Sequence, residues 1–441
     1  MAIDINEFTL PWKPAEACDY IQSQTDNFGV FFDVDRCFEL SGILQMENAK
    51  ISRKCRRLTS NPRLSLNDKQ LVINQFQKMG VKPFSLQTDG GQPGLDAKVL
   101  DALQASNLYD EEVKELAAMY QKFTSNKRNK GYLEKLCYRE HSQALSKLNH
   151  RMAVGRPTWS VLNTSRIAAS NPGVQGIPRS MGDIVCEPKG YTLVRCDSGQ
   201  IEPRINFSTY IRDELIMNLI MHYNDAYYGV LHFCLMSEEE ERRCRENFQS
   251  VFNPIEITTD IKDSRQNIKT LTNAGSYGSS NLGNVNAELA DVYDRKIVHH
   301  PSRLEFERAV SMAVNRGETT FYGQFGTPVT PGETEKYKVG DKGWKNHVIR
   351  CGINNPVQTT ASELMLHSVY AAREILSRAK DSHICFYKHD EACFYVSDED
   401  MANGIGDELA DITAYNVKGW IPIEADALIG IKKGDYPSYI L

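Results

Sequence analysis

The spacing of apolar residues changes along this 441-residue chain from a helical period to a strand-like one and back. From about residue 50 to residue 150, apolar positions recur at helical spacing among many charged ones, as in NDKQLVINQFQKMGV and DEEVKELAAMYQKF. This pattern predicts a helical arm. Residues 1–45 contain the aromatic run NFGVFFDVDRCFEL, which predicts a short ordered segment packed on a larger body.

Two strand-like regions lie further along the chain. The run YTLVRCD after Gly190 is apolar and β-branched, and it ends in Asp197. The segment HICFYKHDEACFYV predicts two short strands that meet at His389, Asp390 and Glu391. Residues 207–340, between these regions, are largely helical in pattern. Together, the helical and strand-like patterns indicate a mixed α+β fold. The chain is much longer than the about 100 to 200 residues that usually share a single core, which predicts several subdomains.

Charge and cysteine content narrow the class of protein. The net charge of -6 argues against a chain that coats nucleic acid over its whole surface, so any such contact must be local. The eleven cysteines form no CxxC pair, and Cys196, Cys385 and Cys393 lie in apolar runs that suit buried thiols. We therefore expect a reducing, cytoplasmic location. The absence of a signal sequence, and of an apolar run near about 20 residues, predicts a soluble protein that does not enter a membrane.

Basic residues gather at two places on the predicted helical arm. Such clusters on an acidic protein could hold a phosphate backbone, although from charge alone an ordinary solvated helix face is the more common explanation. The clusters are Lys50, Arg53, Lys54, Arg56 and Arg57, and then Lys122, Lys127, Arg128 and Lys130.

Asp197 and Asp390 are two carboxylates that one sheet could place side by side. Two-metal phosphoryl transfer needs such a pair, because ions about 3.5 to 4 Å apart activate the attacking oxygen and stabilise the leaving one. Either aspartate alone is more often a turn or cap residue at the end of a strand.

A helix around Arg265 supplies the opposite charge. Positively charged and polar side chains recur every four residues there, and at that spacing they form one stripe along a helix: Arg265, Lys269, Asn273 and Tyr277. Its cations could hold a triphosphate, and its later positions could meet the base and sugar. An exposed amphipathic face is the alternative.

Three motifs of this chain resemble motifs of family A DNA polymerases and occur in the same order as in that family. CDSGQIEPR (residues 196–204) resembles DYSQIELR, and RQNIKTLTNAGSYG (265–278) resembles the fingers-helix pattern of Arg, three residues, Lys, seven residues, Tyr-Gly. KHDEA (388–392) resembles the His-Asp-Glu motif. Two more segments, TSRIAASNPGVQGIP and INNPVQTTASELM, and a thumb-like segment from residue 61 extend the similarity over roughly residues 30–435.

The resemblance implies the right-hand architecture of the large fragment of bacterial DNA polymerase I. We expect an N-terminal segment packed on the base of palm and thumb, and four further parts in chain order. These are a thumb at 46–150, a first palm part at 151–206, fingers at 207–344 with the motif helix at about 262–278, and a second palm part at 345–441.

The resemblance also implies roles for single residues. Asp197 and Asp390, with the carbonyl of Ser198, would bind two Mg²⁺ ions, or Mn²⁺ in their place. Lys269 would be the general acid for pyrophosphate departure. The residues expected to bind the deoxynucleoside triphosphate are Gln200, Glu202, Arg265, Lys269, Asn273 and Tyr277. Those expected to contact primer-template DNA, largely in the minor groove, are Arg166, Asn354, Gln358 and His389. From the two basic clusters we also expect Arg53, Lys54, Lys127 and Arg128 to contact DNA.

Two residues favour DNA synthesis over RNA synthesis. Glu202 matches the glutamate that crowds the 2′ position of the nucleotide, whereas single-subunit RNA polymerases carry a small residue there. Those enzymes also carry Ser where this chain has Glu391. A catalytically silent palm-fingers protein that binds DNA or serves as an accessory subunit is the alternative from another class.

The chain departs from the family pattern at three places. Ser198-Gly199 replaces Tyr-Ser, so the hydrogen bond from that Tyr to Glu202 is lost; Asn273 replaces an aromatic residue; and Tyr227 is the nearest match to a family histidine. The nucleotide pocket is therefore expected to be less standard than the metal site. We further expect no proofreading exonuclease, no thioredoxin-type processivity loop between about residues 119 and 137, and a viral or phage source for a replication or repair enzyme.

Overall fold

The computed structural model describes residues 2–3, 10–88, 92–138, 152–276, 285–332, 339 and 341–430. The chain forms two compact units, and each is considered by itself. The larger comprises the described residues of Met1–Val30, Arg156–Ile177 and Glu187–Tyr439. The smaller comprises those of Phe31–Gly155 and Pro178–Cys186.

The smaller unit is helical, as the polar helical pattern predicts. Asp33 caps its first long helix by accepting a hydrogen bond from the main-chain N–H of Arg36 at 2.8 Å. Its elements are β2 (Val30–Asp33), α2 (Val34–Leu58), α3 (Lys69–Lys78), η1 (Pro83–Leu86), α4 (Ala97–Ala105), α5 (Glu111–Tyr138), β3 (Met152–Gly155) and η3 (Arg179–Ile184). The predicted boundary at residue 45 falls inside α2.

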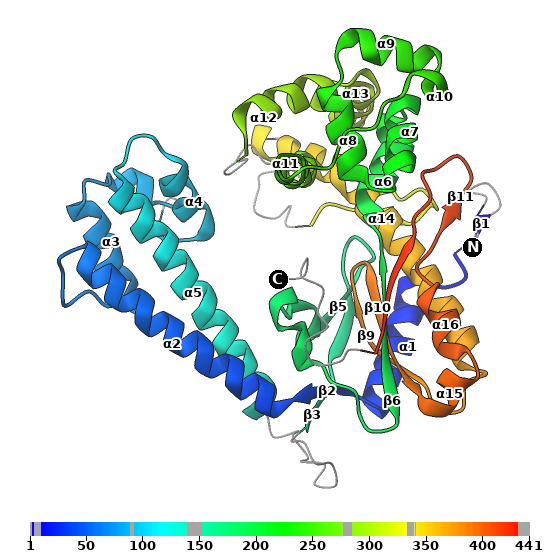
Figure 1. Ribbon diagram of the computed structural model, residues 1–441, viewed down its shortest axis with the longest axis horizontal. Helices are drawn as coiled ribbons and strands as arrows, with labels where there is room; N and C mark the ends of the chain where they lie inside the picture. The colour runs from blue at the N-terminus through cyan, green and yellow to red at the C-terminus, as the bar shows by residue number, and fades with distance from the viewer. Residues whose placement is uncertain are drawn as a thin grey trace. The chain divides into compact units, whose positions relative to one another are not determined.

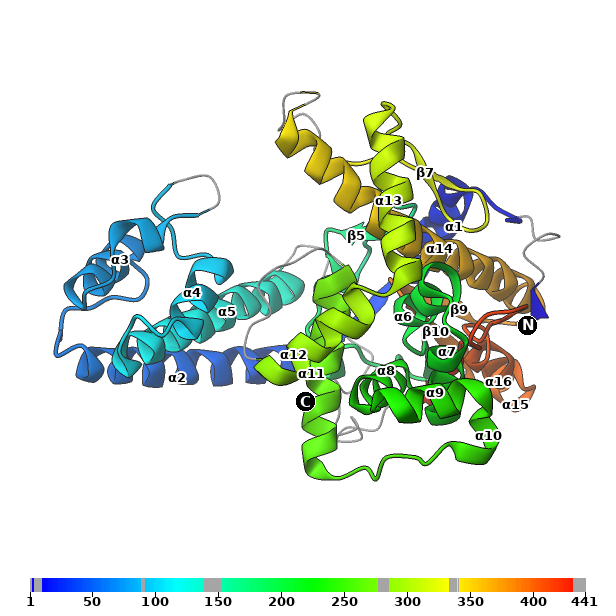
Figure 2. The ribbon, with the colours of Figure 1, turned by 90° about the horizontal axis from the view of Figure 1, so that it is seen from above.

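Helices α2 and α5 lie side by side (Figures 1 and 2), and the core of this unit also includes residues of α3 and α4. Leu64, Phe76 and Leu116 are among its fully buried apolar side chains. Polar contacts also join the helices: the Asn126 amide donates to the Glu47 carboxylate at 2.7 Å. A long two-helix scaffold therefore carries the basic residues of both clusters.

A four-stranded antiparallel sheet forms the centre of the larger unit, in the order β12-β6-β10-β9. Both predicted strand regions are confirmed. The strands are β6 (Tyr191–Ser198), β9 (His383–Lys388), β10 (Glu391–Ser397) and β12 (Ala425–Ile429). Because β6 pairs with β10 on one side and β12 on the other, its last residues lie in the middle of the sheet.

The long helix α14 (Lys342–Leu376) packs against the end of β6 through Met365. The Ser198 hydroxyl points into that interface, where it donates to the carbonyl oxygen of Thr413 at 3.1 Å and lies 3.4 Å from the Met365 sulfur. Successive strand side chains point to opposite faces, so Asp197 faces away from α14. The same unit contains α1 (Pro14–Asn27), α15 (Asp398–Ala402), α16 (Ile405–Ala410) and the strands β1 (Ala2–Ile3), β4 (Thr158–Val161), β5 (Ile167–Ser170) and β11 (Asn416–Val417), with the turn η2 (Val174–Gly176).

The described part of the segment between β6 and α14 is mostly helical and includes a small hairpin of β7 (Phe321–Tyr322) and β8 (Pro328–Val329). Ile216, Val230 and Ile268 belong to its fully buried core. Its helices are α6 (Ile201–Asn206), the π-helix η4 (Phe207–Ile211), α7 (Glu214–Tyr223), α8 (Ala226–Leu235), α9 (Glu238–Glu246), α10 (Phe248–Val251), α11 (Thr259–Ser276), α12 (Ala287–Tyr293), the π-helix η5 (Asp294–Val298) and α13 (Pro301–Asn315).

Two expectations from the sequence concern buried cysteines and membrane-spanning helices. Cys196, Cys385 and Cys393 are buried free thiols, as predicted. Over the ranges given above, none of the helices is both long and apolar enough to cross a membrane.

Candidate active site

The ends of two neighbouring strands bring the two predicted metal-binding aspartates together. Asp197 is the penultimate residue of β6, and Asp390 lies in the turn directly before β10. The main-chain N–H of Ser198 donates to the carbonyl oxygen of Asp390 at 2.8 Å, so the two segments are in direct contact. The neighbouring His389 takes a left-handed conformation with φ 51°, which makes the turn tight. The predicted juxtaposition within one sheet is therefore confirmed.

Two further carboxylates share a row of the sheet with Asp197. Glu391 on β10 and Asp426 on β12 are both its cross-strand partners, so the three side chains face the same side. Glu391 is buried and forms an ion pair with Arg195, which neutralises it. Asp426 is exposed. This leaves Asp197 and Asp390 as the partly exposed pair at the strand ends.

The donor set of this pair suits a hard divalent cation. Mg²⁺ is bound in proteins through one or two carboxylates together with oxygens from substrate and water. The Ser198 side chain is committed to the α14 interface, so only its main-chain carbonyl is available as the third predicted ligand. Among the described residues, no group of three or more His, Cys, Asp or Glu is placed to hold a metal ion.

The turn after β6 places Gln200 and Glu202 beside the aspartates. Gln200 has left-handed backbone angles, φ 55° and ψ 44°, and begins helix α6. The buried Arg204 fixes that helix by donating to the carbonyl oxygens of Pro422 and Asn224. The main-chain N–H of Gly199 donates to the carbonyl oxygen of Glu424 at 2.8 Å, which fixes the preceding turn.

Glu202 forms an ion pair with Arg166, which directly precedes β5. Both side chains are mostly buried, with exposed fractions of 27% and 18%. Helix α14 holds the arginine's neighbour in place, since the Ser362 hydroxyl donates to the carbonyl oxygen of Ser165 at 2.8 Å. The predicted sugar-selecting residue and a predicted DNA-binding residue are thus in contact, which the sequence did not indicate.

Arg166 also affects the pKa of His389, which lies in the turn between β9 and β10. Loss of hydration lowers the pKa of His389 below its ordinary value, and the nearby cations Arg166 and Lys388 lower it further. A neutral imidazole at pH 7 can both donate and accept a hydrogen bond, which suits contact with a base or sugar edge.

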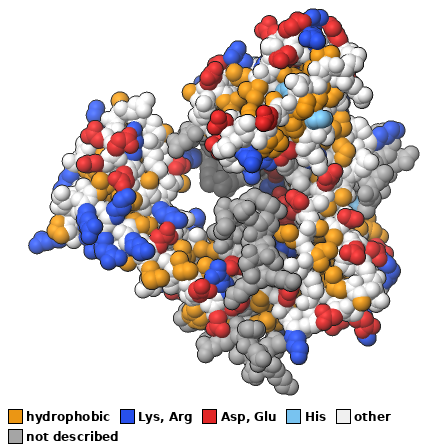
Figure 3. Space-filling view, in the orientation of Figure 1, with side chains coloured by type: hydrophobic (Ala, Val, Ile, Leu, Met, Phe, Trp, Pro, Cys, Tyr) orange, Lys and Arg blue, Asp and Glu red, His pale blue; other side chains and the backbone are white. Residues whose placement is uncertain are grey.

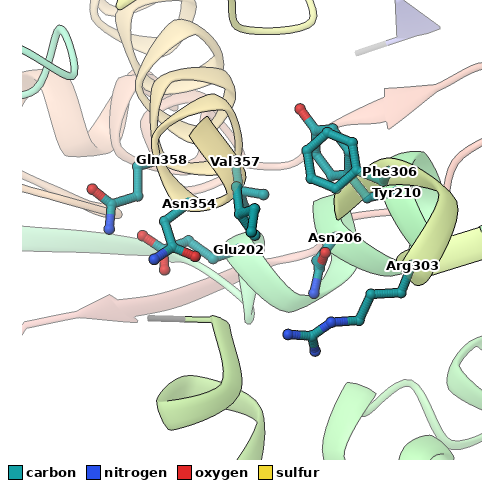
Figure 4. Close-up of a pocket in the computed structure, with 9 residues that line it drawn as sticks. Glu202, Asn206, Tyr210, Arg303, Phe306, Asn354, Val357 and Gln358 are labelled. Atoms are coloured by element: carbon teal, nitrogen blue, oxygen red, sulfur yellow. The ribbon is translucent and has the colours of Figure 1, made fainter. Parts of the chain in front are cut away.

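A small pocket beside Glu202 gathers three of the predicted residues (Figure 4). Glu202 comes from α6, and Asn354 and Gln358 come from successive turns of α14. The other lining residues were not predicted: Asn206, Tyr210, Arg303, Phe306, Ile353 and Val357. Asn206 lies four residues after Glu202 on the same helix, so helical spacing offered a signal for it. No pattern in the sequence indicated Arg303, which lies on α13.

The predicted cationic stripe lies on α11, which covers most of the expected helix at 262–278. The guanidinium carbon of Arg265 lies 5.2 Å from the centre of the Tyr227 ring, and the Lys269 ammonium lies 5.8 Å from the same ring. Tyr227, the nearest match to the family histidine, thus serves as an aromatic platform for both cations. Asn273 is exposed, and Tyr277 lies outside the described residues.

In comparisons with known proteins, this chain matches solved structures. No protein-family model matches the sequence, and no curated protein matches it. A solved structure that does match is the POL domain of Pol1 from M. smegmatis, in complex with DNA primer-template and dNTP. The two share 17% sequence identity at a TM-score of 0.72, over 94% of this chain and 69% of that chain. This chain has the fold of a DNA polymerase domain.

The polymerase fold confirms the architecture that the resemblance to family A DNA polymerases implied. The helical unit, the four-stranded sheet and the helices between β6 and α14 are the parts of this fold in the present chain. The likeness is one of fold, so the roles assigned to single side chains remain predictions.

The basic residues predicted to hold DNA are exposed on the helical unit of the polymerase fold. Arg53, Lys54, Lys127 and Arg128 all face solvent, and Figure 3 shows Lys and Arg side chains gathered on one part of this unit. Lys54 pairs with Glu115, and Lys127 donates to the side-chain oxygen of Asn67 at 3.0 Å. A phosphate would compete with those weak surface contacts.

Proposed function

We propose that this chain is a DNA-templated DNA polymerase of the family A type. It would extend the 3′ end of a primer with deoxynucleoside triphosphates, release pyrophosphate, and act in replication or repair. The observation that carries this proposal is the direct contact between the segments of Asp197 and Asp390, within a polymerase fold.

Asp197 and Asp390 would hold two divalent cations, Mg²⁺ or Mn²⁺, with the Ser198 carbonyl as a further ligand. The bound ions would activate the primer 3′ oxygen and stabilise the charge on the leaving pyrophosphate. The aspartates themselves keep the site anionic. The ion pair between Arg195 and Glu391 limits the repulsion within this row of carboxylates.

Arg265 and Lys269 would hold the triphosphate on the α11 side of the site. A guanidinium binds phosphate oxygens in a bidentate manner, whereas an ammonium acts as a compact charge. Lys269 would also give a proton to the pyrophosphate oxygen as its bond to the α-phosphorus breaks. Gln200, Asn273 and Tyr277 would complete the nucleotide site.

Glu202 would exclude ribonucleotides by occupying the space that a 2′-hydroxyl needs. Arg166, Asn354, Gln358 and His389 would contact the newest base pairs in the minor groove, where acceptor atoms are common to all pairs. In this proposal the helical unit is the thumb, and its exposed cations, Arg53, Lys54, Lys127 and Arg128, contact the phosphate backbone.

Primer extension by the purified chain with Mg²⁺ tests this proposal. Wild type should extend a primer, whereas Asp197→Ala and Asp390→Ala should lose extension and keep nearly unchanged affinity for primer-template DNA. Asp398→Asn is the matched control, because this exposed aspartate follows the other end of β10 and should leave activity intact.

Two outcomes would contradict the assignment. Activity within about tenfold of wild type in either aspartate variant, a loss below about 1.4 kcal/mol, would remove that residue from the metal site. DNA binding by a wild-type chain that never extends a primer would favour the silent palm-fingers protein instead.

A further inference from the structure

Arg265 is held by a carboxylate that no motif singled out. Its Nε atom lies 3.2 and 3.1 Å from the two carboxylate oxygens of Asp225, and its Nη2 atom also donates to Asp225. Both side chains are largely buried, with exposed fractions of 25% and 16%. An arginine that is bound side-on in this way has a fixed orientation, because the planar fork makes two contacts with one acid.

Asp225 is itself fixed from two other directions. As the N-cap of α8 it accepts a hydrogen bond from the main-chain N–H of Tyr228 at 2.8 Å. The Gln200 amide donates to it at 2.7 Å, and the oxygen of that amide accepts from the N–H of Ala226 at 2.6 Å. Gln200 lies three residues after Asp197 in the chain, so Asp225 joins the strand-end turn to helix α11.

The plane of the Arg265 guanidinium is set by aromatic rings. Its central carbon lies 5.2 Å from the centre of the Tyr227 ring and 5.1 Å from that of Tyr228. Of the five guanidinium N–H groups, Asp225 takes the Nε–H and one on Nη2. The other three make no hydrogen bond within the part of the chain that the structure describes. They form the edge of the fork that points away from Asp225.

We propose that Asp225 is a positioning residue that orients Arg265 toward the triphosphate of the incoming nucleotide. The inference rests on the proposed function, because it assumes that Arg265 binds phosphate. Asp225 occupies one edge of the guanidinium and leaves the other edge for the phosphate oxygens. It couples this orientation to Gln200, so the triphosphate site and the metal-binding turn are built on one carboxylate.

The substitution Asp225→Asn separates positioning from helix capping. Asparagine caps a helix about as well as aspartate, so the hydrogen bond to Tyr228 is kept while the charge that holds Arg265 is lost. We expect the KM for deoxynucleotides to rise about tenfold, within the effect of losing a charge-assisted hydrogen bond. The KM for primer-template DNA should not change. Asp225→Glu, which restores the charge, should recover part of the loss.

A double-mutant cycle with Arg265→Ala gives the decisive readout. If Asp225 acts through Arg265, adding Asp225→Asn to Arg265→Ala should change kcat/KM by less than about twofold. Asp291→Asn is the matched control: it removes the exposed ion pair between Asp291 of α12 and Arg295 of η5 and should leave nucleotide kinetics unchanged. Melting temperatures of all variants report any loss of folding.

Three results would overturn the inference. These are an unchanged KM in Asp225→Asn, an effect that adds in full to that of Arg265→Ala, and an equal rise in the KM for DNA. Each presupposes an active wild type, so each leaves the proposed polymerase function standing. A wild-type chain without primer extension would instead refute the proposed function and this inference with it.

Discussion

Replacing Glu202 by alanine should open the nucleotide site to ribonucleotides. Glu202 lies in the first turn of α6, five residues after Asp197, and its ion pair with Arg166 holds the side chain in one place. A fixed carboxylate excludes a 2′-hydroxyl more effectively than a mobile one, because the nucleotide cannot push it aside. In this chain Arg166 supplies that restraint on Glu202.

The size of the effect follows from the cost of overpacking. Forcing an extra group into occupied space costs about 1–3 kcal/mol. That corresponds to a discrimination of about 5- to 150-fold between deoxynucleotide and ribonucleotide. Glu202→Ala removes the obstacle and should lower the ratio of the two kcat/KM values by that factor. Glu202→Gln keeps the volume and loses only the charge paired with Arg166, so its ratio should fall by less.

Single-nucleotide insertion with matched deoxynucleotide and ribonucleotide triphosphates measures this ratio directly. Glu214→Ala, an exposed acid in the first turn of α7, is the control and should behave as wild type. A ratio in Glu202→Ala within about twofold of wild type would refute the reasoning, because the gate would then lie elsewhere. An equal loss in Glu202→Gln and Glu202→Ala would show that charge, and not volume, makes the selection.

Three further predictions concern the nucleotide site, the helical unit and stability. Asn273→Tyr should lower the KM for nucleotides, or alter acceptance of dideoxynucleotides, by several fold, because base-aromatic stacking contributes about 1–3 kcal/mol. Unchanged nucleotide kinetics in a folded Asn273→Tyr variant would place Asn273 outside the nucleotide site. Replacing Lys127 or Arg128 by alanine should reduce the slope of log K for DNA against log salt by about one, measured by fluorescence titration, if each contacts one phosphate. Burial alone would raise the pKa of Asp400, but hydrogen bonds from two main-chain N–H groups and two serine hydroxyls outweigh it and lower the pKa to about 2. The ionised carboxylate of Asp400 therefore stabilises the fold above about pH 4, and this stabilisation is lost as the pH falls to about 2. In urea unfolding at pH 7, Asp400→Asn should lower the free energy of unfolding by about 2 kcal/mol, whereas Asp407→Asn, at an exposed position, should not change it.

The parts of the fold that the sequence predicted are those with a local pattern. Strands β6, β9 and β10 are short, mostly apolar runs bounded by charged or polar residues, and α11 carries its cations at helical spacing. The contact between the Asp197 and Asp390 segments was predicted although 193 positions separate them, because each lies in a motif of known order.

The parts that were not predicted depend on contacts between distant residues without a motif. Arg166 and Glu202 are 36 positions apart, and Arg265 and Asp225 are 40 apart. Neither pair shares a helix or a strand, so no periodicity could join them. Asp225 is a residue type that caps helices well, and it does cap α8, but a capping signal carries no information about a partner 40 positions away.

Insertion of a single nucleotide opposite each of the four template bases tests directly whether the chain is a template-directed DNA polymerase. Wild type should add only the deoxynucleotide complementary to the template, with one pyrophosphate released per addition, and Asp197→Asn and Asp390→Asn should add none. Addition that ignores the template base, or undiminished addition by both aspartate variants, would contradict this function.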